Sequence, residues 1–360
     1  MITLSLCMIV KNEQDTLGRC LECVKGLADE IIIVDTGSTD NTKQIALNYT
    51  NKVYDFEWVY DFAKARNYSF SLATKDYIMW LDADDVILDE DIQKLQILKK
   101  IITPDIDMVL LKYNLNPDEN GIPALSFYRE RIVKRSKNYK WVSPIHEVIP
   151  RSGKVLKEEI AITHKKIHAS NPTRNITIFE KMKEKGIALD ARQTFYYARE
   201  LMYSKKYTES INEYTKLFEM KDAWDENKIS ACIDLYTIYT NLKDESKAIS
   251  SLFKSFEYDI PRAEVCCHLG QYFISKKNYT HAIYWFEEAL SKKYDISSGG
   301  FFSKDYYDFI PYIQLCVCYY NLGNIPLAIE YNKKAGSIKP TNENYLKNKS
   351  FFDGIKNRPL

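Results

Sequence analysis

Short apolar runs alternate with amphipathic helical patterns over the first part of the chain. We predict strands over five apolar runs: 3–10, 30–35, 52–56, 77–81 and 108–112. Between them, residues 16–26 and 39–49 place apolar side chains at the helical period. The run at 77–81 is apolar on both faces, so we expect a central strand that is covered on each side. This alternation predicts an α/β layered domain.

Beyond this part the pattern becomes irregular, because prolines interrupt the strand-like pieces between residues 105 and 168. The segment 169–172 is the best boundary signal, since Pro172 can occupy the first turn of a helix that runs toward Gly186. We therefore predict two domains, 1–170 and 171–360.

The second domain is helical in pattern from about Ala191 onward, and it repeats. Small residues recur at equivalent positions: Ser210, Ala248, Ala282 and Ala328. Their spacing is close to the about 34 residues of a tetratricopeptide helix pair, and an insertion at 297–300 lengthens the last interval. Four such units can stack into a superhelix, whose concave groove suits an extended peptide and whose surface could also form a homodimer contact.

Composition excludes several classes of function. The formal net charge is +1, with 45% hydrophobic and 28% charged residues, so we expect neither disorder nor a nucleic-acid partner. The apolar start has no basic region and runs into Lys11, which indicates a strand rather than a signal peptide. No run reaches the about 18 apolar residues of a membrane span, and a cytoplasmic location is the expectation.

The eight cysteines lie mostly in apolar periodic segments, where a reduced thiol behaves as a small hydrophobic group. Cys20 and Cys23 form the only C-x-x-C pair, and no second pair or histidine lies at zinc-ligand spacing. We interpret both as helix residues in a reducing compartment.

An acidic run, 81–85, follows the predicted central strand at the edge where open α/β sheets bind ligands. In an extended conformation Asp82 and Asp84 can point to one side, while Ala83 keeps the other side small. Paired carboxylates suit Mg²⁺ or Mn²⁺. The alternative is that these aspartates cap the following helix, for which Asp85 or Asp89 would be suitable.

Two further segments carry candidate binding residues. Residues 35–40 read Asp-Thr-Gly-Ser-Thr-Asp after the second strand, where Gly37 would let backbone amides approach a ligand and Asp35 can accept from the N3–H of a uracil. A plain turn capped by Thr39 or Asp40 is the alternative.

The other segment places Arg66 and Asn67 at an apparent helix start, where both would face the same pocket. A guanidinium offers the planar donor fork that diphosphate oxygens accept. A buried salt bridge between Arg66 and Asp61 is the alternative.

Four motifs in order resemble the inverting family-2 glycosyltransferases of GT-A fold: 8–13 (Met-Ile-Val-Lys-Asn-Glu), 35–40, 61–67 (Asp-Phe-Ala-Lys-Ala-Arg-Asn) and 81–85 (Leu-Asp-Ala-Asp-Asp). The resemblance implies a Rossmann-like GT-A catalytic domain at 1–170. With the repeats, the whole chain looks like the bacterial group that contains the sublancin S-glycosyltransferase and flagellin-modifying enzymes.

By this resemblance the nucleotide-sugar contacts comprise Val10, Asn12, Glu13, Asp35, Gly37, Arg66, Asn67, Asp82 and Ala83. The segment 10–13 and Asp35 would hold the uridine, and Arg66 the diphosphate. Asp82 would contact the ribose, and Asp84 would bind the metal.

Two of the five histidines bear on the chemistry. Residues 141–147 resemble the family segment on the acceptor side, and residues 162–164 resemble a short strand that brings a third metal ligand. The resemblance implies Glu147 as the base that takes the acceptor proton. His164, or else His146, would complete the metal site, although a lone histidine is more often structural. No Glu-Asp or Asp-Asp pair follows the Asp84 region at the distance expected from many family members.

The resulting hypothesis is an inverting transfer of a hexose or N-acetylhexosamine (glucose or N-acetylglucosamine) from a UDP-sugar, with Mn²⁺ or Mg²⁺. The acceptor would be a Ser, Thr or Cys side chain of a peptide or protein, such as a flagellin or a bacteriocin precursor. One alternative is an enzyme that builds a cell-surface glycan. The other is a non-catalytic scaffold whose repeats bind a partner.

Overall fold

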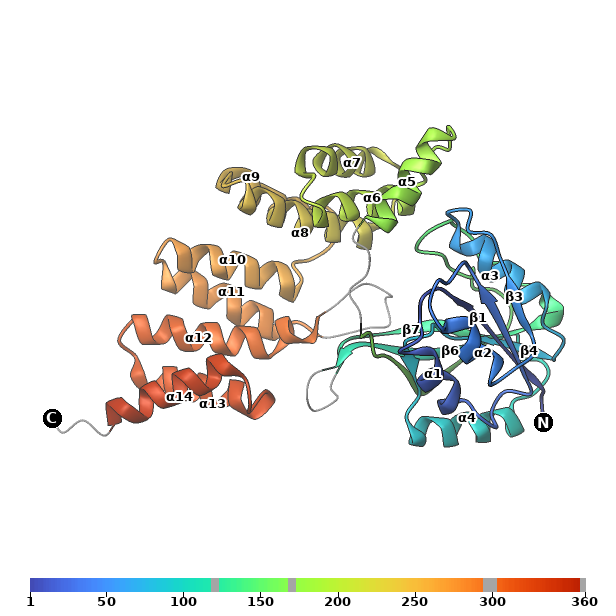
Figure 1. The fold of residues 1–360 in the computed structure, drawn as a ribbon. Helices are drawn as coiled ribbons and strands as arrows, with labels where there is room; N and C mark the ends of the chain where they lie inside the picture. Colours follow the sequence, from blue (N-terminus) through green and yellow to red (C-terminus); the bar gives the residue numbers. More distant parts are fainter. Residues whose placement is uncertain (118–122, 168–172, 294–302, 357–360) are drawn as a thin grey trace. The chain divides into compact units, whose positions relative to one another are not determined.

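The computed structural model describes residues 1–117, 123–167, 173–293 and 303–356, and it divides into two compact units (Figure 1). The first unit is Met1–Glu200 and the second is Leu201–Leu360. The predicted border at residue 170, with Pro172, lies outside the described residues. The first unit continues past it and includes helix α5 (Arg174–Glu184) and most of α6 (Ala191–Tyr203).

The first unit contains one eight-stranded sheet with the order β3-β2-β1-β4-β7-β6-β8-β5. Its strands are β1 (Leu4–Val10), β2 (Glu30–Asp35), β3 (Val53–Asp55), β4 (Tyr77–Trp80), β5 (Asp85–Val86), β6 (Met108–Pro117), β7 (Pro123–Lys134) and β8 (Val155–His164). All five predicted strands are confirmed. β7 and β8 lie in the part expected to be irregular, where Pro117 and Pro123 occupy strand ends that tolerate a missing N–H.

Strands β3, β2, β1 and β4 are parallel, so their carboxyl ends meet at one edge. The register places Val10 beside Asp35, and β7 then continues the sheet antiparallel to β4. β6 pairs with both β7 and β8, and β8 in turn pairs with β5. The last pairing brings the end of β8 back to the segment that follows β4.

Helices cover both faces of this sheet. Alternate β1 residues such as Leu6 and Met8 pack with α1 (Leu17–Cys23), α2 (Thr42–Leu47) and α4 (Asp89–Ile101). Cys7 points to the other face, which packs against α3 (Phe62–Ser71). Every residue of β4 is buried, which confirms the prediction of a covered central strand. The predicted helices at 16–26 and 39–49 are confirmed with shorter bounds.

The second unit is all-helical. Its helices are α7 (Tyr207–Glu219), α8 (Asp225–Asn241), α9 (Glu245–Lys254), α10 (Ala263–Ser275), α11 (Tyr279–Ser291), α12 (Phe309–Asn321), α13 (Ile325–Ile338) and α14 (Glu343–Lys356). Successive helices pack as the pairs α8–α9, α10–α11 and α12–α13. Among the described residues, no helix combines the length and apolar character needed to cross a bilayer.

The small residues predicted to repeat occupy the same place in each unit. Ser210, Ala248, Ala282 and Ala328 are buried, and each is the fourth residue of its helix, in α7, α9, α11 and α13 respectively. Such a position lets the partner helix approach closely, which confirms the repeat prediction. The insertion at 297–300 lies outside the described residues.

Candidate functional site

The loops that follow β1 and β2 are joined at the carboxyl edge of the sheet. Asn12 has a positive φ of 55° and uses its side chain to accept from the Thr39 amide at 2.8 Å. The Asn12 amide donates to Ser38 Oγ at 2.9 Å, and the Glu13 amide donates to Thr42 Oγ1 at 2.6 Å. These contacts join residues that are 26 or more positions apart in the sequence, so the two loops form one wall.

Asp35 shapes the turn after β2. Its Oδ1 accepts from the amides of Gly37 at 2.8 Å and Ser38 at 2.7 Å, and Gly37 has a φ of 98°. The turn is therefore present, but the N-cap of α2 is Asn41 and neither Thr39 nor Asp40, although Asp40 does accept from the Thr42 amide at the start of α2. Asp35 remains at the carboxyl edge, nearly buried.

Val10 and Glu13 have defined places in this wall. Val10 is buried, and its carbonyl accepts from the Thr36 amide at 2.9 Å and from Thr36 Oγ1 at 3.1 Å. The Glu13 carboxylate accepts from Thr16 Oγ1 at 2.6 Å. The structure thus brings four predicted uridine contacts, Val10, Asn12, Glu13 and Asp35, to adjacent loops.

Arg66 is the centre of a charge network that the sequence did not predict. Its Nε donates to Glu147 Oε1 and its Nη2 to Asp82 Oδ1, both at 2.7 Å. The guanidinium carbon lies 4.9 Å from the Trp80 ring centroid and 4.8 Å from that of Trp141. Burial opposes the charge of Arg66, but the carboxylates of Asp82 and Glu147 give its pKa a net increase.

The same network keeps Asp82 ionised. Burial alone would raise the pKa of Asp82, but Arg66 and Arg131 lower it to about 2. The alternative salt bridge between Arg66 and Asp61 is not formed, because Asp61 caps α3 by accepting from the Lys64 amide at 2.9 Å. Arg66 therefore links Asp82 to Glu147.

Asn67 points elsewhere. Arg66 and Asn67 lie in the middle of α3 rather than at its start, and their side chains take different partners. Asn67 Nδ2 donates to the Trp141 carbonyl, and its Oδ1 accepts from the Trp141 amide, both at 2.9 Å. Asn67 thus fastens the segment before Glu147 to α3, and the structure does not bring it into one pocket with Arg66.

The acidic run after β4 is a turn, so the expectation of an extended conformation was wrong. The Asp85 amide donates to the Asp82 carbonyl at 3.0 Å, and the Asp82 carboxylate pairs with Arg66 while those of Asp84 and Asp85 lie near His164. Ala83 is buried in the apolar core. The capping alternative is also wrong, because the N-cap of α4 is Leu88 and its side chain makes no cap bond.

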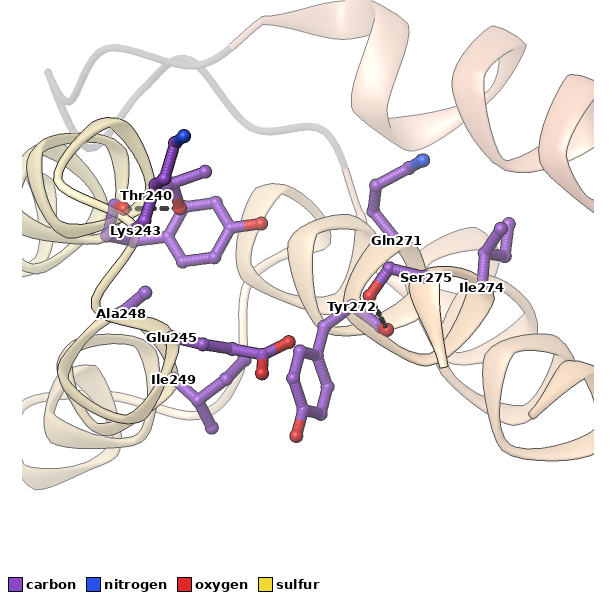
Figure 2. A pocket seen from close by; sticks show the side chains of 10 residues that line it. Thr240, Lys243, Glu245, Ala248, Ile249, Gln271, Tyr272, Ile274 and Ser275 are labelled. Atoms are coloured by element: carbon purple, nitrogen blue, oxygen red, sulfur yellow. Dashed lines mark hydrogen bonds between the residues drawn. The ribbon is translucent and has the colours of Figure 1, made fainter. Parts of the chain in front are cut away.

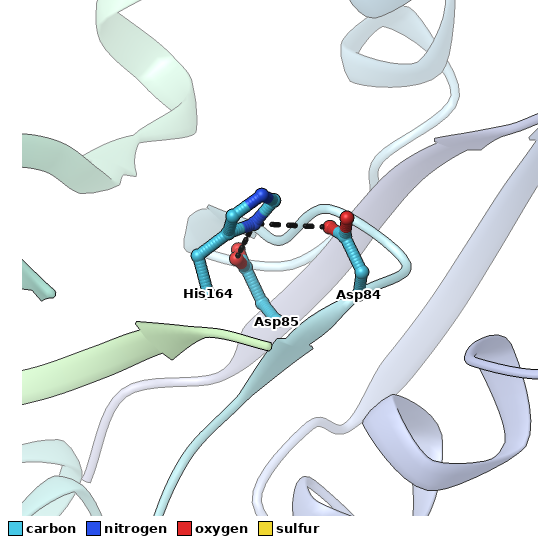
Figure 3. A group of neighbouring side chains, drawn as sticks. All are labelled: Asp84, Asp85 and His164. Carbon is cyan, nitrogen blue, oxygen red and sulfur yellow. Dashed lines mark ion pairs between the residues drawn. The ribbon is translucent and has the colours of Figure 1, made fainter. Parts of the chain in front are cut away.

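Asp84, Asp85 and His164 form the one group of three or more metal-type ligands among the described residues (Figure 3). Their ligand atoms all lie within 4.8 Å of one another, and the pairing of β5 with β8 places Asp85 opposite His164. His164 Nδ1 is 3.2 Å from Asp84 Oδ1 and 3.6 Å from Asp85 Oδ1. Burial lowers the pKa of His164, but these two carboxylates raise it to about 10.

Asp85 anchors this group, because its carboxylate is already occupied by other hydrogen-bond donors. It is fully buried, and it accepts from Tyr113 Oη at 2.9 Å, from Arg131 Nη1 at 3.0 Å and from the Asp82 amide at 3.0 Å. The Arg131 guanidinium lies over the rings of Trp80 and Tyr113, at 3.8 and 4.3 Å. The carboxylate of Asp84 and the imidazole of His164 remain as donors, an oxygen–nitrogen set that suits Mn²⁺.

The sequence interpretation missed the roles of Asp85, Arg131 and Tyr113. The one available signal was a charged residue, Arg131, directly before the apolar pair Ile132 and Val133.

His146 lies away from the Asp84 group. Its Nε2 is 3.2 Å from Glu200 Oε1, and its ring stacks on Tyr196 with centroids 4.0 Å apart. The structure therefore brings His164, and not His146, next to Asp84.

The family match from the comparisons with known proteins lies in the first unit. Residues 5–161 match the family model described as "Glycosyl transferase family 2". The chain is 32% identical over 160 residues to a TPR repeat-containing protein of Synechococcus elongatus, covering 44% of this chain and 38% of that one. It is 27% identical over 239 residues to the SPbeta prophage-derived glycosyltransferase SunS of Bacillus subtilis, covering 61% and 56%. The chain thus spans less than two thirds of either relative.

Two solved structures each resemble about half of the chain. Glucosyl-3-phosphoglycerate synthase from Mycobacterium tuberculosis, in complex with Mn²⁺ and UDP-glucose, is 15% identical with a TM-score of 0.36, covering 53% of this chain and 81% of that one. The MamA protein is 18% identical with a TM-score of 0.34, covering 45% and 79%. Both scores are low, so the fold assignment rests on the strand order and helix pairs described above.

Proposed function

We propose that this chain transfers a sugar from a UDP-sugar donor with the help of a divalent metal, and the match of residues 5–161 to the glycosyl transferase family 2 model supports this. One observation carries the proposal: the Asp84–His164 pair, the Arg66–Asp82 pair and the Asp35 turn follow strands of the same sheet. Open α/β sheets bind nucleotides at this edge.

The donor would lie across the loops after β1, β2 and β4. Asp35 and the segment 10–13 would contact the uridine, with the amide of Gly37 close by. Asp82 would meet the ribose. The Arg66 guanidinium has five N–H donors and uses one on each of two carboxylates, which leaves others for a diphosphate oxygen.

Asp84 and His164 would hold the metal. When bound, a divalent ion neutralises the negative charge that develops on the leaving diphosphate. His164 must give up a proton to serve as a ligand, because only the neutral imidazole has a free lone pair. Asp85 is itself held by Arg131 and Tyr113, and it would keep the His164 ring in place beside Asp84.

Glu147 would act as the base of an inverting transfer. As the acceptor oxygen or sulfur bonds to the anomeric carbon, the bond from that carbon to the diphosphate oxygen breaks on the opposite face and UDP leaves. The acceptor proton passes to the Glu147 carboxylate. Its bond to Arg66 would hold this carboxylate beside Asp82, and therefore near the donor.

We propose a peptide or protein acceptor, flagellin-like or bacteriocin-like, modified on Ser, Thr or Cys with a hexose or N-acetylhexosamine. The support is the repeat unit, in which a cavity of about 510 Å³ opens between α8, α9 and α10 (Figure 2). Tyr236, Thr240, Gln271 and Tyr272 line it and offer both ring surface and hydrogen-bonding groups. A cytoplasmic location and a homodimer through the repeats belong to the same proposal.

The test uses the purified chain with UDP-glucose or UDP-N-acetylglucosamine, Mn²⁺, and a flagellin or a small Cys-containing precursor peptide. We expect UDP release together with a mass increase of the acceptor by one sugar. Asp84→Ala and His164→Ala should both abolish the metal-dependent rate, whereas Asp222→Ala, an exposed aspartate of the second unit, should not. No UDP release and no calorimetric UDP binding would refute the proposal and favour a scaffold.

A further inference from the structure

The loop that carries Glu147 has an uncommon backbone. Ser143 has a φ of 74° and His146 a φ of 51°. Residues other than glycine rarely adopt this backbone conformation. Such conformations persist only where surrounding contacts impose them. The groups that hold Ser143 and His146 therefore decide where the next side chain, Glu147, points.

Helix α3 holds one side of this loop. The Phe62 amide, at the first residue of α3, donates to the Pro144 carbonyl at 2.8 Å. Asn67 adds the two hydrogen bonds to the Trp141 backbone described above. These contacts fix the start and the middle of the loop but leave His146 to other partners.

Helix α6 holds the other side through its first turn. Arg192 Nη1 donates to the His146 carbonyl at 2.6 Å. Gln193 Nε2 donates to Ser143 Oγ at 3.1 Å. Both contacts reach the two residues whose φ is positive, so α6 supplies the contacts that the strained backbone requires.

Further along the same helix face, Tyr196 and Glu200 hold the His146 ring. The rings of His146 and Tyr196 are stacked, with 15° between their planes. Glu200 Oε1 lies 3.2 Å from His146 Nε2 and accepts from Asn175 Nδ2 of α5 at 2.7 Å. Burial raises the pKa of Glu200, but its bonds to His146 and Asn175 give a net decrease, so the carboxylate stays charged.

Arg192, Tyr196 and Glu200 are spaced four residues apart and therefore share one side of α6. We propose that this face of α6 orients the base, with Tyr196 and Glu200 as positioning residues that act through His146 on the adjacent Glu147. The inference rests on the proposed function, in which Glu147 takes the acceptor proton. It assigns α6, which precedes the second unit in sequence, to the transferase site.

The experiment compares Glu200→Ala and Tyr196→Ala with the conservative variants Glu200→Gln and Tyr196→Phe. The control is Glu184→Ala, an exposed glutamate at the end of α5. Amide hydrogen exchange of peptides covering residues 141–149 measures how firmly the loop is held. Steady-state kinetics with a UDP-sugar and the acceptor show through kcat whether Glu147 is still correctly placed as the base.

In both alanine variants we expect faster exchange at 141–149 with unchanged exchange in β1 and β4. We expect kcat to fall about 10- to 100-fold, the size of effect that a misplaced catalytic group produces. The KM for the UDP-sugar should stay within about threefold, because the donor contacts are retained. The two conservative variants should restore most of kcat, and the control should match the wild type.

Unchanged exchange and kcat in a folded Tyr196→Ala variant would overturn the proposal, as would equal losses in Glu200→Gln and Glu200→Ala. If Glu200→Ala does not fold, the comparison of Tyr196→Ala with Tyr196→Phe tests the proposal. A wild-type chain that transfers no sugar would refute the proposed function, while the exchange measurement would still report whether α6 holds the loop.

Discussion

The buried ion pair between Asp85 and Arg131 offers the sharpest test of how the site is held. Both side chains have 0% exposed surface, and the Asp85 Oδ2 to Arg131 Nη1 distance is 3.0 Å. Removing one partner of such a pair leaves an uncompensated buried charge, which typically costs about 3–5 kcal/mol. Arg131→Met keeps the apolar contact with the Trp80 ring but removes the charge.

The expected cost lies at the lower end of that range. Asp85 would keep its hydrogen bonds from Tyr113 Oη and from the Asp82 amide, and a hydrogen bond to a charged group contributes about 1.5–3 kcal/mol. We therefore expect Arg131→Met to lower the free energy of unfolding of the first unit by about 3 kcal/mol. Because removing both charges leaves neither one buried alone, Asp85→Asn combined with Arg131→Met should cost less than the sum of the two single changes.

The assay is urea unfolding followed by circular dichroism and by tryptophan fluorescence. Arg135→Met is the matched control, because Arg135 is exposed at the end of the same hairpin. It loses one exposed hydrogen bond, from Arg135 Nε to the Lys75 carbonyl at 2.6 Å, and should change the free energy by no more than about 1 kcal/mol. If Arg131→Met costs no more than Arg135→Met, the buried pair does not support the site and the reasoning is refuted.

Three more predictions concern separate features. The pKa of His164 rises from 6.5 to about 10, so its ion pairs stabilise the metal-free fold fully below about pH 6.5 and are lost as the pH rises toward 10. Mn²⁺ must displace that proton, so its affinity measured by calorimetry should increase with pH. Gly270→Ala would place a Cβ 2.6 Å from a Phe286 ring carbon and should cost about 1–3 kcal/mol in urea unfolding. Asn67→Ala should cost about 1–3 kcal/mol, because it leaves the Trp141 amide and carbonyl without these partners.

Each of these predictions has an outcome that would contradict it. Mn²⁺ affinity that does not change with pH would contradict a protonated His164. Gly354→Ala, with nothing within 4 Å of the added Cβ, should stabilise α14 by about 0.5–1 kcal/mol, and an equal effect of Gly270→Ala would contradict the close approach. An Asn67→Ala variant with wild-type stability and unchanged Trp141 fluorescence would show that the loop is held by other contacts.

The sequence predicted the strands and helices whose apolar residues recur at a regular local spacing. The run at 30–35 became β2 with the same bounds, and the repeating small residues identified the second unit. It did not predict β7, whose first residue Pro123 resembled a break, and it indicated only the end of β8, at 162–164, through the family resemblance. Arg66 and Glu147, which meet at 2.7 Å, are 81 residues apart, and no periodicity reports such a contact.

The three aspartates after β4 illustrate why an acidic motif alone does not define a metal site. Asp82 forms an ion pair with Arg66, which it shares with Glu147, and Asp85 forms one with the buried Arg131. Asp84 has its ion pair with His164, which is cationic only while it keeps its proton. Loss of that proton leaves one uncompensated carboxylate beside a neutral imidazole, which attracts a divalent cation. A divalent ion held there would bring positive charge to the carboxyl edge of the sheet, which is the electrostatic condition that the proposed transfer requires.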